Sequence, residues 1–214
     1  MIMKKILAVL GIGFFCVVMV NSYFNKTQTA LAKGVIRLHV LANSDTVEDQ
    51  ELKLKVRDRI INEMNGIFSD GGDVSLAREV IVNNIEKIKQ IAVDEVKKNG
   101  FSYDVNVSLN HSGFPTKSYG EIVLPAGNYE ALKVEIGKAK GQNWWCVLFP
   151  PLCFVDESCV SYSSEGAKMV MANVGSENAE FIKKEKSPKV QLKFKSYEIW
   201  QSGKQRLAYL FGIR

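Results

Sequence analysis

The segment from Asn143 to Phe154 constrains the fold of this chain more than any other segment. Its twelve residues hold two of the three tryptophans, two of the four cysteines and two of the five prolines. Rigid aromatic side chains beside oxidisable cysteines favour a buried strand and a sharp bend that are tied together by a disulfide. Because disulfides persist mainly outside the reducing cytosol, the segment predicts a protein that is exported.

The N-terminus carries the pattern of an export signal. Lys4 and Lys5 precede residues 6–20, fifteen positions without a charged or polar side chain, and Ala30-Leu31-Ala32 follows. A charged start, an apolar stretch and an A-x-A site are typical of a secretory signal peptide. Since about 20 apolar residues are needed to cross a bilayer, the short stretch favours cleavage. The alternative is an uncleaved anchor, with membrane contact through residues 6–20.

Most of the positive charge belongs to this N-terminal segment. The chain has a formal net charge of +5, and residues 1–32 contain three lysines and no acidic residue. The rest is nearly neutral, which argues against nucleic-acid binding. We expect a signal peptide or anchor at 1–32, a single domain at 33–156, and a C-terminal extension at 157–214 that docks on the domain or is partly flexible.

Three cysteines remain after residue 32, which allows one disulfide and one leftover thiol. Cys146 and Cys153 are the favoured pair, because Pro150-Pro151 turns the chain between them. Cys153 with Cys159 is the competing pair. The alternative to any disulfide is that all three are small buried hydrophobic residues.

Residues 35–98 predict a strand followed by a helical hairpin. Residues 35–41 alternate as a half-buried strand with Arg37 and His39 on its polar face. Apolar residues then recur at helical spacing to about residue 68, and again from 80 to 92 after a short break. The first helix has two possible capping registers, Asp45 with Glu48 and Thr46 with Asp49, and Ser75 can cap the second. Lys53, Lys55, Arg57, Asp58 and Arg59 are expected mostly on the solvated side of the first helix.

Beyond residue 100 the hydrophobic period changes to two, which predicts strands. A turn at residues 125–128 is expected to join two of these strands as a hairpin. The sequence therefore predicts an α+β fold, with an N-terminal strand and helical hairpin followed by an antiparallel β-meander, and a poorly determined C-terminal tail in which residues 166–174 can form a helix. The expected strands of the meander span residues 101–109, 119–124, 129–136 and 144–149.

No set of residues predicts catalysis, a cofactor or a metal site. The two histidines, His39 and His111, are far apart and lack metal-ligand spacing. Cys146 with His111 could form a cysteine-peptidase pair, but an apolar strand raises the pKa of a thiol. Asp45 and Asp49 are better explained as helix-capping residues than as an acid and base pair. These observations favour a binding or signalling module over an enzyme, and we expect no small-molecule substrate.

Three blocks carry a resemblance to a known family: residues 36–45 (IRLHVLANSD) continuing to Asp58, residues 114–120 (FPTKSYG) with 125–131 (PAGNYEA), and residues 143–154 (NWWCVLFPPLCF). The chain resembles the stage II sporulation protein R family of endospore-forming bacteria. The resemblance implies a signal secreted from the forespore into the space between the two membranes that separate it from the mother cell. There it would activate a membrane-embedded aspartic protease of the mother cell, which then cleaves a pro-sigma factor.

Two groups of residues are candidates for contact with that protease. One is a charged edge beside the first helix, and the other is a pair of aromatic anchors of the kind that dominate interface energetics. The alternative for the charged edge is a capped helix start with a solvated face, and the alternative for the aromatic pair is a core packed over a disulfide. Two other functions are alternatives to this signalling role. One is a secreted cysteine peptidase or cell-wall hydrolase, and the other is a membrane-tethered structural protein of the intermembrane space. The candidate contact residues are Asn43, Ser44, Asp45, Asp49, Gln50, Lys53, Arg57, Trp144 and Trp145.

Overall fold

The computed structural model of the 214-residue chain describes residues 11–13, 15, 18–19, 22, 26–68, 73–155, 160–162 and 164–183. For residues 65, 67, 153–155 and 160–162 it describes the backbone alone. The predictions about most of the export segment, and about the tail beyond residue 183, lie outside the described residues. No helix in the described part of the chain has the length and apolar character needed to span a bilayer.

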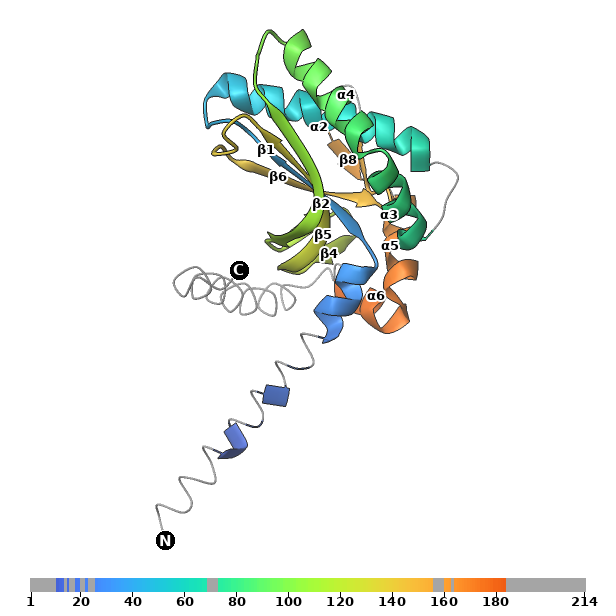
Figure 1. The fold of residues 1–214 in the computed structure, drawn as a ribbon. Helices are drawn as coiled ribbons and strands as arrows, with labels where there is room; N and C mark the ends of the chain where they lie inside the picture. Colours follow the sequence, from blue (N-terminus) through green and yellow to red (C-terminus); the bar gives the residue numbers. More distant parts are fainter. Residues whose placement is uncertain are drawn as a thin grey trace.

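A four-stranded sheet is the centre of the fold (Figure 1). Its strands in spatial order are β2 (Val105–Phe114), β5 (Gly127–Ile136), β1 (Ile36–Leu41) and β6 (Asn143–Phe149). β2 and β5 pair antiparallel over ten residues, and β1 also pairs antiparallel with β6. Two short hairpins, β3 (Lys117–Tyr119) with β4 (Ile122–Leu124) and β7 (Cys153–Val155) with β8 (Val160–Tyr162), are separate from this sheet.

The predicted α+β class and a sheet rich in antiparallel pairs are confirmed, and two details of strand pairing differ. β1 runs parallel to β5. In addition, residues 119–124 do not form a hairpin with residues 129–136, because the chain turns back on itself at Gly120, where φ is +56° and a side chain would be strained. β5 is left to pair with β2, a strand of equal length.

Three helices follow β1, and they pack on one face of the sheet (Figure 1). α2 (Val47–Phe68) ends where the sequence predicted. The second predicted helix is divided into α3 (Val74–Asn83) and α4 (Ile85–Lys98), because Asn84 Nδ2 donates to the carbonyl of Val80 and ends α3. Asp73, not Ser75, caps α3, since its side chain accepts from the N–H of Leu76 (2.8 Å).

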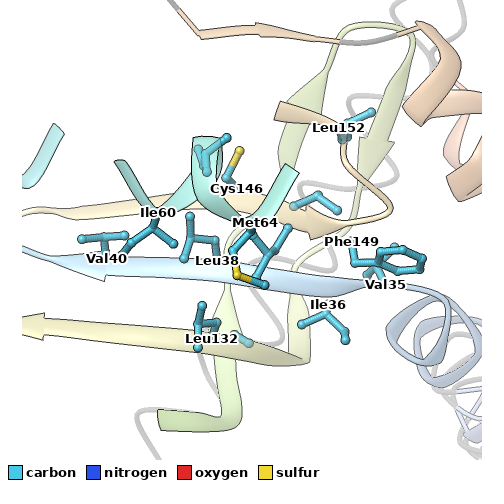
Figure 2. Close-up of a cluster of buried hydrophobic side chains, with 14 of the residues drawn as sticks. Val35, Ile36, Leu38, Val40, Ile60, Met64, Leu132, Cys146, Phe149 and Leu152 are labelled. Atoms are coloured by element: carbon cyan, nitrogen blue, oxygen red, sulfur yellow. The ribbon is translucent and has the colours of Figure 1, made fainter. Parts of the chain in front are cut away.

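The main core lies between this helical layer and the sheet. Figure 2 shows Ile60 and Met64 of α2 beside Leu38 and Val40 of β1, with Cys146 of β6 close to them. These side chains are almost fully buried. Because side chains of a strand alternate between its faces, Ile36, Leu38 and Val40 all face the helices.

The opposite face of β1 is also buried, so the prediction of a half-buried strand was wrong. The β3–β4 hairpin covers this face with the buried side chains of Tyr119, Ile122 and Leu124. Arg37 is 0% exposed, and its guanidinium carbon lies 4.1 Å from the ring centre of Phe114. A strand covered on both faces places its polar residues inside the protein.

Segments on both sides of the predicted domain contribute to the core. Residues 26–33 are helical, and Leu31 is fully buried. At the other end, α5 (Ser164–Val174) agrees with the predicted helix at 166–174, and together with α6 (Ser176–Ile182) it adds Val170 and Ile182 to the buried cluster. The described part of the C-terminal extension is therefore packed on the domain.

Candidate functional site

The predicted charged edge forms a hydrogen-bonded corner where β1 leads into α2. Asp49 Oδ2 accepts from Ser44 Oγ (2.6 Å) and from Asn43 Nδ2 (2.8 Å). Gln50 Nε2 donates to the carbonyl of Ser44 (2.8 Å). Of the two predicted capping registers, only the Thr46 register is used, with the N–H of Asp49 3.4 Å from Thr46 Oγ1. We call these residues, 43–50, the corner.

The loop at residues 137–142 packs tightly against this corner. Asp45 Oδ1 accepts from the N–H of Gln142 (2.7 Å), and Asn43 Oδ1 accepts from the N–H of Lys138 (3.0 Å). A Cβ atom at Gly141 would lie 2.1 Å from the carbonyl oxygen of Ser44. Only glycine fits so close a backbone contact, so the corner fixes the chain just before β6.

Asp49 is 3% exposed and remains ionised in this corner. Burial by itself raises the pKa of its carboxyl group, but the hydrogen bonds from Ser44, Asn43 and Tyr103 together outweigh burial and lower the pKa below its usual value. A buried carboxylate that accepts several hydrogen bonds is typical of a structural anchor. The predicted role of Asp49 in partner contact stays a prediction.

Lys53 and Arg57 are buried, at 4% and 6% exposed, so the prediction that they lie on the solvated side of α2 was wrong for them. Lys53 Nζ donates to Gln50 Oε1 (2.5 Å) and to the carbonyl of Gln142 (3.1 Å). Arg57 pairs with Asp58 (2.5 Å) and lies over the ring of Trp144, 4.1 Å from its centre. Trp144 and the loop that precedes β6 both pack over this flank of α2. Helical periodicity alone does not predict which flank of a helix other segments will bury.

The environment of Lys53 disfavours its charge. Burial lowers the pKa of the ammonium group, and the neighbouring guanidinium of Arg57 lowers it further, while Asp45 acts in the opposite direction. Among the described residues, no carboxylate forms an ion pair with Lys53. Lys53 and Arg57, through their contacts with Gln142 and Trp144, thus connect α2 to the start of β6.

Trp145 belongs to a second buried group, on the hairpin side of the sheet. Its ring stacks on His39, with centres 5.9 Å apart and planes at 18°. His39 Nε2 is 2.8 Å from Asn143 Oδ1, and burial lowers the pKa of the imidazole. Neither Trp144 nor Trp145 has an acceptor for its indole N–H within the described part of the chain. Both rings are half-buried, and their role as anchors for a partner stays a prediction.

Arg37 is buried, although the alternation of its strand predicted it on a polar face. Its Nε donates to the carbonyl of Cys146 (3.1 Å), and its Nη2 donates to the hydroxyl of Tyr119. Phe114, Tyr119 and Tyr129 surround the guanidinium, and Nη1 has no partner among the described residues. Strand alternation predicts that an arginine at such a position faces solvent, because the pattern contains no information about the β3–β4 hairpin that covers it.

Cys146 is disulfide-bonded. The side chain of Cys153 and residue 159 lie outside what the structure describes, so the pairing of Cys146 with Cys153 stays a prediction. His111 is on β2 and Cys146 on β6, with β5 and β1 between them. Adjacent strands are about 4.8 Å apart, so roughly 14 Å separates the two strands. The structure does not bring these residues together as a catalytic pair.

The described residues also contain no group of three His, Cys, Asp or Glu side chains that could hold a metal ion. The fold and these clusters therefore define a disulfide-containing α+β domain whose predicted charged edge is largely bonded within the domain.

The chain belongs to the stage II sporulation protein R (spore_II_R) family, whose model matches residues 32–159. It is 46% identical over 123 residues to stage II sporulation protein R of Bacillus subtilis (strain 168). That match covers 58% of this chain and 55% of the relative, so the similarity extends over about half of the relative's length. No solved structure matches the chain significantly.

Proposed function

We propose that this protein is a secreted intercompartmental signal of sporulation. It acts in the space between forespore and mother cell, where it activates a membrane-embedded aspartic protease of the mother cell and so leads to cleavage of a pro-sigma factor. The observation that carries the proposal is membership of the stage II sporulation protein R family over residues 32–159. The 46% identity to the Bacillus subtilis protein supports it.

Two structural observations fit a protein that acts by contact outside the cytosol. The disulfide at Cys146 suits an oxidising compartment. The cysteine and histidine considered for catalysis lie on opposite edges of the sheet. A protein of this kind activates its target by binding the active arrangement of the protease more tightly than the inactive one.

The packing of residues 26–33 supports retention of this segment with the domain. Leu31 is fully buried, and Gln28 Nε2 donates to the carbonyl of Asn128 (2.9 Å). Cleavage after Ala32 would remove both contacts. The proposal therefore favours the uncleaved alternative, in which the N-terminal segment holds the domain at the membrane.

Co-expression tests the proposed function. The chain, the candidate aspartic protease and its pro-sigma substrate are produced together in a non-sporulating host, with export of the chain intact. Processing of the substrate is expected only when all three are present. Processing that is equally fast without the chain, or absent with it, contradicts the proposal.

A further inference from the structure

We propose that the outer edge of β2, which no described strand covers, binds an extended segment of the partner protein as an added antiparallel or parallel strand, with an acidic side chain of that segment beside Lys97. This inference rests on the proposed function, because it identifies the surface by which the domain contacts its protease. β2 is the last strand of the sheet, and no described strand pairs with its outer side.

The direction of the backbone groups of β2 follows from one hydrogen bond. The N–H of Gly137 donates to the carbonyl of Asp104 (2.8 Å), directly before the first β2–β5 pair, Val105 with Ile136. Hydrogen-bonded and non-hydrogen-bonded pairs alternate in an antiparallel ladder, and the β2–β5 register continues without a shift. The residues that direct their N–H and C=O away from β5 are therefore Val105, Val107, Leu109, His111 and Gly113.

The features that usually protect an edge strand are missing from β2. Edge strands of monomeric proteins are commonly short, bulged, or interrupted by lysine or proline. β2 is ten residues long, contains no charged residue and no proline, and has no bulge. Several of its side chains, among them Asn106, Asn110 and His111, are exposed. Such an edge is suited to strand addition, in which main-chain hydrogen bonds provide the affinity.

A hollow at the start of β2 gives the added strand a chemical preference. It has a volume of about 660 Å³, and Val105 of the open edge is part of its wall. The rings of Phe101 and Tyr103 stack with centres 5.3 Å apart and form an apolar side of the hollow. Lys89 and Lys97 add two ammonium groups against the single carboxylate of Asp104. An acidic side chain next to an apolar one complements this surface.

A second copy of the chain fits this edge less well. If two β2 strands paired antiparallel with full overlap, Phe114 of one copy would lie opposite Val105 of the other, and residues 114–118 would lie at its hollow. That stretch, Phe-Pro-Thr-Lys-Ser, contains a lysine and no carboxylate to face Lys89 and Lys97. The charge of the hollow therefore favours a different protein over self-association.

Two pairs of variants test the proposal, with the detergent-solubilised candidate protease as the probe. His111→Pro removes one outward N–H without removing a bond to β5, and proline is tolerated on the free side of edge strands. His111→Thr changes the same side chain and keeps the N–H. We expect about tenfold weaker binding for His111→Pro, with pro-sigma processing reduced in parallel, and no change for His111→Thr.

The second pair changes charge and leaves the strand intact. Lys97→Glu places a carboxylate in the hollow, and Lys98→Glu makes the same change one residue further along α4, outside the hollow. We expect about three- to tenfold weaker binding for Lys97→Glu only. Both lysines are exposed in the last turn of α4, so the loss of a cation at the end of the helix is common to the two variants. Lys98→Glu also loses the ion pair with Glu95 (3.9 Å), so thermal unfolding of both variants is measured alongside binding.

The outcomes separate this inference from the function on which it rests. If the unchanged chain binds and activates the protease while His111→Pro and Lys97→Glu behave like their controls, the β2 surface is overturned and the proposed function stands. If the unchanged chain neither binds nor activates, both fail. Loss of self-association in His111→Pro, with binding to the protease unchanged, would assign the edge to a second copy and also overturn the proposal.

Discussion

The two edges of the sheet are built in opposite ways. β6 contains the two adjacent tryptophans and the disulfide-bonded Cys146, and its register with β1 shifts at Ile36/Arg37. The corner and Lys53 fix the loop that enters it. β2 has a continuous register, polar uncharged side chains and no described partner on its outer side. The least common residues thus stabilise one edge, and the plainest strand forms the edge that we propose for contact.

The largest expected effect tests the disulfide at the β6 edge. Cys146→Ala should lower the free energy of unfolding by about 2–5 kcal/mol, because the bridge no longer constrains the unfolded chain. If Cys146 pairs with Cys153, Cys153→Ala has the same effect and Cys159→Ala leaves the bridge intact. Denaturant unfolding under non-reducing conditions measures all three. A large loss for Cys159→Ala with none for Cys153→Ala would show that the predicted pairing is wrong.

The next effect concerns residues 26–33, which pack at the end of the β2 edge. Gln28 of this segment lies over Gly127, and Gly127 pairs with Phe114 of β2. Leu31→Ala should lower the free energy of unfolding by about 2–4 kcal/mol, because it leaves a cavity in the core. Val47→Ala is the control, since Val47 is 69% exposed, and its effect should stay within about 0.5 kcal/mol. Equal stability of the two variants would exclude residues 26–33 from the fold.

A smaller effect is expected at the corner that supports β6. Asp49→Asn should lower the free energy of unfolding by about 1–3 kcal/mol, because Ser44 and Asn43 lose a charged acceptor. Glu51→Gln, two residues further along α2 on its exposed side, is the matched control and should have little effect. If Asp49→Asn is fully stable but no longer activates the protease, Asp49 belongs to the contact surface after all.

The pH dependence of stability gives the smallest effect. Burial lowers the pKa of His39 below 6.5, Lys133 and Arg37 lower it further, and Asn143 and Glu135 raise it. The unfolded chain therefore binds a proton at a higher pH than the folded chain does, so stability is lost as pH falls through 6.5. Thermal unfolding at pH 7.5 and 5.5 should show this loss in the unchanged chain and a weaker one in His39→Gln. An identical loss in the variant would assign it to other groups.

Local patterns predicted the elements well and their surroundings poorly. β1, α2 and the strand at β6 follow from hydrophobic period and β-branched composition, which are properties of a short window. Arg37 was expected on a polar face, but the β3–β4 hairpin, formed some eighty residues later, covers it. Lys53 and Arg57 were likewise covered by residues 142–144. A short stretch of sequence does not show which distant segments will pack over it in the folded protein.

For the candidate site, the sequence identified the residues of the corner, and of these Asp49 is buried while the others are partly or fully exposed. Their polar groups bond within the domain, because loops 43–46 and 137–142 meet there and their backbone groups need partners. For β2, the sequence showed a regular alternation of apolar and polar residues, which predicted a strand but not its place at an edge of the sheet. Whether a strand lies at an edge depends on the order of strands in the sheet, which alternation does not encode.

Hydrogen exchange resolved at single amides compares the two edges in one experiment. In the free protein, the outward N–H groups of Val107, Leu109 and His111 should exchange quickly, because no described strand pairs with them. Addition of the solubilised protease should slow exchange at these three amides and leave β6 unchanged. Slower exchange confined to β6 and the corner, with β2 unaffected, would contradict this account and return the contact surface to Trp144 and Trp145.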